Sequence, residues 1–299
     1  MEARYLQLHI GPEQDGRDVN SLLRRELGLS GTVLRRIKWL EDGIALDGAR
    51  VTVRARVRAG QVLAVRLSDP EDAPQPEPAI GPLDVVYEDA DLAVVNKAPG
   101  MLVHPSHGHF DDTVGNYLMG RWRAAGEAAG FHPVHRLDKG TSGLLAVAKH
   151  PYGQERLKNQ LHTGDFIRRY LAVCEGCPDP AEGVIDAPIA PVEGSLMARE
   201  VRPGGQHART RYRVLSVHGG RALLELELDT GRTHQIRVHM AHIGHPLTGD
   251  FLYGTEDRDL IPRPALHSWQ IELTHPVTGA RLTLEAPLPE DMGKLTMDN

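Results

Sequence analysis

The sequence has very little cysteine, because only Cys174 and Cys177 occur among 299 residues. A disulfide framework is therefore excluded, and we expect a reducing cytoplasm. Long apolar runs are also missing, both at the start, where a signal peptide needs one, and elsewhere, where a membrane helix needs about 18 such residues. We expect neither export nor a membrane partner.

The sequence also lacks a phosphate-binding loop and an excess of positive charge, and each absence excludes a class of function. No glycine-rich loop is followed by Lys and Ser or Thr, so ATP or GTP chemistry and a nucleotide cofactor are not expected. The chain also lacks an excess of positive charge, with 34 Lys and Arg against 40 Asp and Glu and a net charge of −6. Taken whole, this charge argues against a general polyanion binder.

The charge is unevenly distributed, and this asymmetry suggests domains. Residues 69–82 read DPEDAPQPEPAIGP, with five prolines, four acids and no base, which is typical of an extended linker. Residues 14–68 hold eleven Lys and Arg against six Asp and Glu, a net charge of +5. We therefore predict an N-terminal extension over 1–13, a small basic domain over 14–68, the linker over 69–82, and a large domain over 83–299.

The basic domain is predicted to contain two helices and a small sheet. Apolar residues from Val19 to Leu27 repeat at helical spacing, and a second helix follows Ser30, with Leu34, Ile37 and Leu40 on one face. Residues 44–51 read as a hairpin that turns at Asp47-Gly48, and residues 61–67 read as another strand.

Arg35, Arg36 and Lys38 project from the other faces of the second helix. Such a charge run is often only a solvated helix face. An RNA contact is favoured here because the positive charge is confined to one compact unit of an acidic chain.

The large domain alternates strand-like runs with few helical patterns. Two strong hairpin patterns stand late in the chain, at residues 211–228 and 271–284. The fold class is therefore α+β, with a mixed, mainly antiparallel sheet and peripheral helices.

The segment His135 to Lys149 packs charged and small polar residues into a turn that runs into an apolar strand. Asp138 lies there between Arg136 and Lys139, cations that favour an ionised carboxylate able to act as nucleophile or base. From spacing alone, a purely structural role is also open, in which Asp138 caps the turn and forms a surface ion pair with Arg136.

A second segment, Asp229 to Gly244, predicts a helix through His242 with Thr233 as its cap. Arg237 lies one turn beyond Thr233, where it either faces inward to pair with a carboxylate or is exposed.

Four motifs resemble the RluA/RluD family of pseudouridine synthases and stand in that family's order. They are NKAPGMLVHPSHGH, HRLDKGTSGLLAVAK, GRTHQIRVHMAHIGHPLTGD and HPVTGARLTLEAPLP, within a match over residues 83–289. Residues 14–67 are similar to the RNA-binding domain named after ribosomal protein S4. The resemblance implies the pseudouridine synthase fold preceded by a small α/β S4-like RNA-binding domain.

The resemblance also implies roles for single residues. Asp138 matches the catalytic aspartate, which attacks the target nucleotide, and Arg237 matches the arginine that pairs with that aspartate. Tyr170 matches the tyrosine that stacks on uracil and takes part in removing the proton from carbon 5. Arg136 matches the arginine that fills the gap left in the RNA when the base is extruded. The implied reaction needs no metal and no redox cofactor.

The expected partner is structured RNA, with large-subunit ribosomal RNA favoured and transfer RNA as the alternative. A noncatalytic RNA-binding or ribosome-assembly protein is a further alternative. A hydrolase using Ser142, His135 and Asp138 is another, although three residues of one turn rarely form such a triad. We expect a monomer.

Other polar clusters receive no role. Cys174 and Cys177 have the spacing of half a zinc site, but a second pair is missing. His104, His107, His109, His239 and His242 all fall within the family's motifs, and no metal site is expected.

Overall fold

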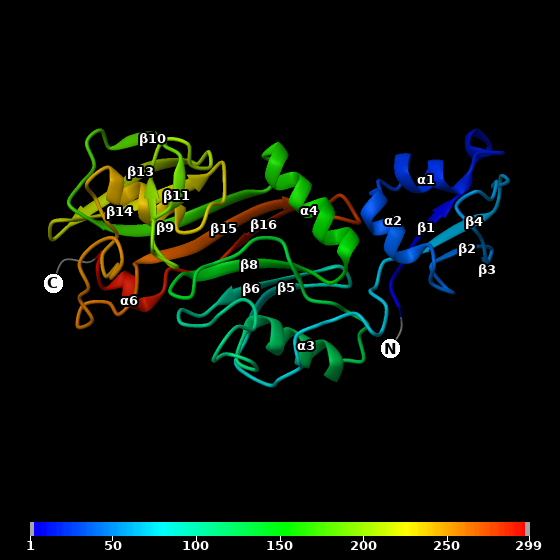
Figure 1. Cartoon of the computed structure of the whole chain (residues 1–299), viewed down its shortest axis with the longest axis horizontal. Helices are drawn as coiled ribbons and strands as arrows, with labels where there is room; N and C mark the ends of the chain where they lie inside the picture. Colours follow the sequence, from blue (N-terminus) through cyan, green and yellow to red (C-terminus); the bar gives the residue numbers. More distant parts are fainter. Residues whose placement is uncertain (1–2, 297–299) are drawn as a thin grey trace.

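The computed structural model describes residues 3–296, which form a small N-terminal domain beside a larger sheet domain (Figure 1). The N-terminal domain packs two helices on a four-stranded antiparallel sheet ordered β1-β4-β2-β3. Its elements are β1 (Tyr5–His9), the short 3₁₀ helix η1 (Pro12–Gln14), α1 (Val19–Arg25), α2 (Gly31–Ile37), β2 (Ile44–Leu46), β3 (Ala49–Arg50) and β4 (Val62–Arg66).

The two predicted helices and the hairpin are confirmed, and local chemistry accounts for them. Asp18 accepts a hydrogen bond from the amide of Ser21 at the start of α1, and Ser30 caps α2 in the same way. Asp47 and Gly48 both have positive φ at the hairpin turn. The helix α2 ends at Ile37, so Leu40 lies beyond it, packed against the domain core from a turn.

The prediction of an N-terminal extension over residues 1–13 is wrong. Within it, β1 pairs with β4 along its whole length, Leu8 opposite Leu63. Leu6, Leu8 and Ile10 alternate with polar residues and pack on the domain core, as one face of a strand does. The small domain therefore begins before residue 14, and the first two residues lie outside the described part.

The proline-rich linker is extended, as predicted, but it is not a free spacer. It lies along α3 (Val114–Ala124), where the Asn116 side chain donates to the carbonyl oxygen of Glu77 at 2.7 Å. The amide of Ala79 in turn donates to the carbonyl oxygen of Asn116 at 3.0 Å. These bonds anchor the linker to the large domain.

The large domain is built on a ten-stranded sheet whose main path runs β10-β13-β14-β9-β15-β8-β6-β5. Every pairing in it is antiparallel except that of β15 with β8, which confirms the mixed, mainly antiparallel sheet. The two predicted late hairpins are present. The strands of the domain are β5 (Asp84–Glu88), β6 (Leu92–Lys97), β7 (His132–Pro133), β8 (Ser142–Ala148), β9 (Ile167–Glu175), β10 (Glu182–Asp186), β11 (Ile189–Pro191), β12 (Arg199–Val201), β13 (Arg209–His218), β14 (Arg221–Leu228), β15 (Leu266–Thr274) and β16 (Arg281–Glu285).

The centre of the sheet is covered on both faces, which explains the apolar run in β8. Leu145 and Val147 belong to the same core cluster as Trp122 of α3, whereas Leu144 and Ala146 share a cluster with Leu157 of α4 (Pro151–Thr163). Because alternate residues face opposite sides of a strand, β8 is buried at every position. Figure 1 shows α3 and α4 on opposite sides of the sheet.

The remaining helices are α5 (Gln235–His242) and α6 (Glu290–Gly293). None of the helices between residues 3 and 296 is long and apolar enough to cross a membrane.

The two domains are joined by α4 and by an ion pair between a half-exposed arginine and a buried aspartate. Tyr152 of α4 is 5% exposed within the N-terminal core, and its hydroxyl donates to the carbonyl oxygen of Leu27. The Arg4 guanidinium donates to both oxygens of Asp91, at 2.8 and 3.0 Å. The capping residue of α2, Ser30, also donates to Glu155 of α4, so the N-terminal domain is fixed to the sheet domain by several contacts.

Candidate active site

Asp138 lies on the loop between β7 and β8, at the edge of the large sheet. Its carbonyl oxygen accepts a hydrogen bond from the amide of Thr141, which closes a tight turn before β8 begins. Its carboxylate is 20% exposed, so it is shielded but accessible. The alternative in which Asp138 pairs with Arg136 in a surface ion pair is not what the structure shows, because the side chain within 4 Å of its carboxylate is the imidazole of His234. Burial lowers the pKa of His234.

Two buried cationic side chains hold the backbone next to Asp138. Lys97, at the end of β6, donates to the carbonyl oxygen of Lys139 at 3.2 Å and to two further carbonyl groups. Burial lowers the pKa of Lys97 to about 7. Arg263 donates to the carbonyl oxygen of Gly140 and forms a two-bond ion pair with Asp291. The loop is therefore rigidly placed.

The facing wall is the turn between β14 and α5. Thr233 was expected to cap this helix, but the helix begins at Gln235, and His234 precedes it with φ +57° and no capping bond from its side chain. The Gln235 side chain fixes the turn before the helix, because its oxygen accepts hydrogen bonds from the amide of Arg232 and the hydroxyl of Thr230. This turn places His234 against Asp138, with 3.9 Å between Nε2 and Oδ2.

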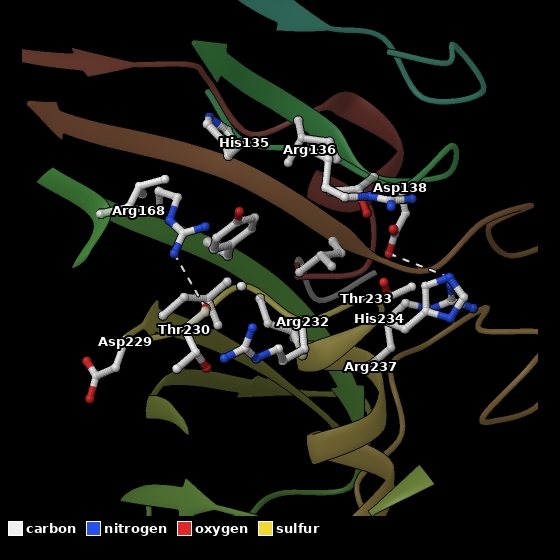
Figure 2. Close-up of a pocket in the computed structure, with 18 of the residues that line it drawn as sticks. His135, Arg136, Asp138, Arg168, Asp229, Thr230, Arg232, Thr233, His234 and Arg237 are labelled. Atoms are coloured by element: carbon white, nitrogen blue, oxygen red, sulfur yellow. Dashed lines mark hydrogen bonds and ion pairs between the residues drawn. The ribbon is translucent and has the colours of Figure 1, made fainter. Parts of the chain in front are cut away.

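Between the two walls lies a cavity of ≈ 350 Å³ (Figure 2). Asp138 and Arg136 line one side of it, and His234 and Arg237 line the other. Arg168 and Tyr170 of β9 complete the lining, so four of the residues singled out from the sequence meet at one place. Two carboxylates line the cavity, and they differ in their partners. Asp229 pairs with Arg209 and Arg211, whereas Asp138 has no arginine or lysine within 4 Å among residues 3–296.

Arg237 is held by Asp250 and not, as expected, by Asp138. Its Nε and Nη2 atoms donate to the two oxygens of Asp250 at 2.7 and 2.6 Å, and both residues are buried. Burial alone lowers the pKa of Arg237, but the bonds to Asp250 reverse this and raise it. The rings of Phe251 and Tyr253 flank the guanidinium. Sequence spacing left open whether Arg237 faces inward, and the family resemblance implied a pairing with Asp138 that the structure replaces with Asp250.

Tyr170 is 4% exposed and faces the cavity from β9. Burial raises its pKa, so the phenol is protonated at neutral pH. A neutral phenol offers a flat ring on which a base can stack. Before its oxygen can take up a proton from a substrate, it must first give up the proton that it carries. Arg136 lines the cavity and is exposed to solvent.

The hydrolase alternative is wrong. Ser142 is buried, and its hydroxyl lies 3.0 Å from Nδ1 of His267, on another strand. Nε2 of His135 instead accepts a hydrogen bond from the amide of Ala146. Burial and the nearby charge of Arg168 lower the pKa of His135 to about 3. Ser142, His135 and Asp138 therefore form no relay.

Of the cysteines and histidines set aside above, Cys174 and His239 are buried. Cys174 is buried and Cys177 exposed, and both are free thiols. His239 is bound on both ring nitrogens, by Thr210 and the carbonyl oxygen of Ala187. Within residues 3–296 the one cluster with ligand-like spacing is Asp89, Asp91 and His275, and its carboxylates are already paired, Asp91 with Arg4 and His150.

Several residues of the site were not found from the sequence. Three of them bind partners that do not neighbour them in the sequence, namely Asp250, Lys97 and Arg263. The fourth, His234, is placed beside Asp138 by its positive φ. Arg168 stands two residues before Tyr170 and therefore on the same face of β9. That spacing was the available signal.

Comparisons with known proteins identify the family of the chain. A family model for RNA pseudouridylate synthase matches residues 91–242. The uncharacterized RNA pseudouridine synthase YjbO of Bacillus subtilis is 39% identical over 272 residues, covering 90% of this chain and 95% of the relative. The ribosomal large subunit pseudouridine synthase D of Vibrio cholerae is 41% identical over 276 residues, covering 87% and 84%.

The fold agrees as well. The structure of human RNA pseudouridylate synthase domain containing 4 superposes with a TM-score of 0.57 at 25% identity, covering 70% of this chain and 90% of that one. Sequence relatives, family model and fold thus point to the same reaction class. The chain belongs to the RNA pseudouridylate synthase family, and it is an isomerase.

Proposed function

We propose that this enzyme isomerises specific uridines of large-subunit ribosomal RNA, with Asp138 as the nucleophile. The observation that carries the proposal is the position of Asp138, whose shielded carboxylate lines a cavity together with Tyr170, Arg136 and Arg237. Relatives named as large-subunit enzymes support the ribosomal substrate. The two free cysteines are consistent with the cytoplasm as the place of action.

The proposed reaction is an internal exchange of bonds. After the target base leaves the RNA stack, Asp138 attacks the nucleotide and the bond between N1 of uracil and C1′ of ribose breaks. The base turns, a bond forms between C5 and C1′, and the bond that Asp138 had formed to the nucleotide breaks, which restores the free carboxylate. The proton on C5 departs while N1 takes one up. No atom is gained or lost overall, so the cavity has to orient the base and exclude water rather than deliver a reagent.

Each side chain has a task in this scheme. Tyr170 stacks on the uracil and takes part in the departure of the C5 proton. Arg237, fixed by Asp250, keeps a cation near Asp138 without neutralising it through a direct bond. Arg136 occupies the gap in the RNA from which the base has left, which offsets part of the cost of extrusion.

Release of tritium from RNA labelled at C5 of uridine tests the proposal. We expect release from unmodified ribosomal RNA and little from transfer RNA, each supplied as a separate pool. Release from transfer RNA alone would make the chain a transfer RNA enzyme. Binding of RNA without release from either pool would instead favour a noncatalytic RNA-binding or ribosome-assembly protein, the alternative that family membership makes the weaker one.

We further propose that the N-terminal domain is an S4-like RNA-binding domain. Arg35 and Arg36 are exposed on α2. Lys38 follows the helix, with its ammonium group 4.9 Å from the ring centroid of Trp39, which is itself 76% exposed. A cationic helix face beside an exposed aromatic ring suits contacts with both phosphates and bases.

Replacing Arg35, Arg36 and Lys38 together by Gln is expected to weaken RNA binding and flatten its dependence on salt. Each phosphate contact contributes a slope of about 0.7–0.9 in log K against log salt, so three lost contacts change it by about 2–3. Filter binding over a series of salt concentrations measures this. Arg123→Gln, an exposed change on α3, is the matched control. An unchanged slope in the triple variant would place the RNA contacts elsewhere.

A further inference from the structure

Arg168 is a buried arginine that has no carboxylate partner among residues 3–296. The residue is 6% exposed, and within residues 3–296 its Nε has no hydrogen-bond partner. Its Nη2 reaches the carbonyl oxygen of Thr230 only across 3.4 Å, a long and weak bond. The other buried arginines differ, since Arg237 and Arg263 each bind a carboxylate through two hydrogen bonds.

Such an arrangement is costly in the free protein. A buried charge is normally paired, because moving it out of water is expensive and only a close opposite charge compensates. A single neutral carbonyl group at long range does not supply that compensation. We therefore expect the negatively charged partner of Arg168 to be a bound ligand.

The guanidinium of Arg168 points into the active-site cavity. Arg168 lines the cavity from β9 on the same strand face as Tyr170, and Figure 2 shows its guanidinium directed at the turn that carries Thr230. At Gly231 of that turn, a side-chain carbon would stand 3.0 Å from Nη1, so the glycine keeps the space around the guanidinium open. The guanidinium thus borders the cavity in which the proposed function places the target nucleotide.

We propose that Arg168 binds a backbone phosphate of the target nucleotide and so positions its base over Tyr170. This inference rests on the proposed function and adds a substrate contact to it. A phosphate matches the need for a full negative charge, and its oxygens accept paired hydrogen bonds from a planar guanidinium. A uracil carbonyl group offers one acceptor and no charge, which would leave the cation uncompensated.

Titration of the intact protein with small ligands tests the contact without requiring turnover. The probes are uridine, uridine 5′-monophosphate and uridine 3′-monophosphate, followed by calorimetry. We expect one monophosphate to bind the wild type about tenfold or more tightly than uridine does. The preferred isomer identifies whether the phosphate on the 5′ or the 3′ side is bound. Arg168→Gln should lose this preference with the uridine affinity unchanged, and Arg168→Lys should keep part of it.

Thermal melting separates this role from a structural one. Removing an unpaired buried charge should leave the melting temperature of Arg168→Gln equal to or above that of the wild type. Arg263→Gln, which breaks a paired buried cation, should melt at a lower temperature. A fall in the melting temperature of Arg168→Gln as large as that of Arg263→Gln would overturn the inference.

The ligand titration has its own contrary results. Equal binding of uridine and both monophosphates by the wild type, or a preference that survives in Arg168→Gln, would overturn the phosphate contact. Loss of uridine binding alone in Arg168→Gln would assign the side chain to the base, which also contradicts the inference. Tritium release measured in parallel keeps the proposed function separate, since a phosphate preference without release refutes only that function.

Discussion

Asp250→Asn is expected to lower the free energy of unfolding by about 3–5 kcal/mol, because it leaves the buried Arg237 guanidinium without its counter-charge. The asparagine oxygen can still accept hydrogen bonds from the amides of Leu252 and Tyr253. The measured loss of stability therefore reports the removal of the negative charge and not the loss of these two bonds. Urea denaturation measures it. Tritium release should fall as well, because Arg237 is no longer fixed beside the cavity.

Two matched variants sharpen this prediction. Asp229→Asn removes a carboxylate that pairs with Arg209 and Arg211 near the surface, and should cost about 1 kcal/mol or less. Adding Arg237→Met to Asp250→Asn removes the stranded cation and should restore most of the stability without restoring activity. An Asp250→Asn variant as stable as Asp229→Asn would show that the buried pair is not what holds this part of the site.

Gly143→Ala is expected to destabilise the protein by about 3 kcal/mol or more, from backbone strain and overpacking combined. Gly143 has φ +106°, and a methyl group there would stand 2.2 Å from the carbonyl oxygen of Ser268. That contact is to backbone, at the parallel pairing of β8 with β15, so it cannot be relieved by a side-chain rotation. Chemical denaturation measures the loss.

Gly126→Ala is the control for backbone strain alone. Gly126 also has positive φ, but a methyl group there meets nothing within 4 Å. We expect a loss of about 1 kcal/mol at that position. Equal losses at Gly126 and Gly143 would mean that close packing of β8 on β15 contributes nothing, contrary to the structure.

Local signals in the sequence predicted the elements that local chemistry determines. Ser30 caps α2 through its own neighbours, and Asp47 and Gly48 provide the positive φ that a tight hairpin needs. The apolar run of β8 reflects burial on both faces, and the polar turn before it contains Asp138. Each of these features depends on residues a few positions apart.

Contacts between residues far apart in the sequence could not be predicted from local patterns. Asp250 stands 13 residues from Arg237 and shows no periodicity that marks it as the partner. The strand β1 was taken for an extension because its partner β4 comes more than fifty residues later. Thr233 has the chemistry of a cap, but the left-handed backbone at His234 moves the start of α5 beyond it. Tertiary context decided all three.

Tritium release from C5-labelled ribosomal RNA by the wild type, Asp138→Asn and Ser142→Ala tests the central claim most directly. Asparagine is nearly the same size as aspartate but cannot act as an anionic nucleophile, so we predict that Asp138→Asn releases no measurable tritium while RNA binding persists. Ser142→Ala should keep much of the activity, because its hydroxyl is bonded inside the sheet to His267. Substantial release by Asp138→Asn, or loss of release in Ser142→Ala as complete as in Asp138→Asn, would contradict the account.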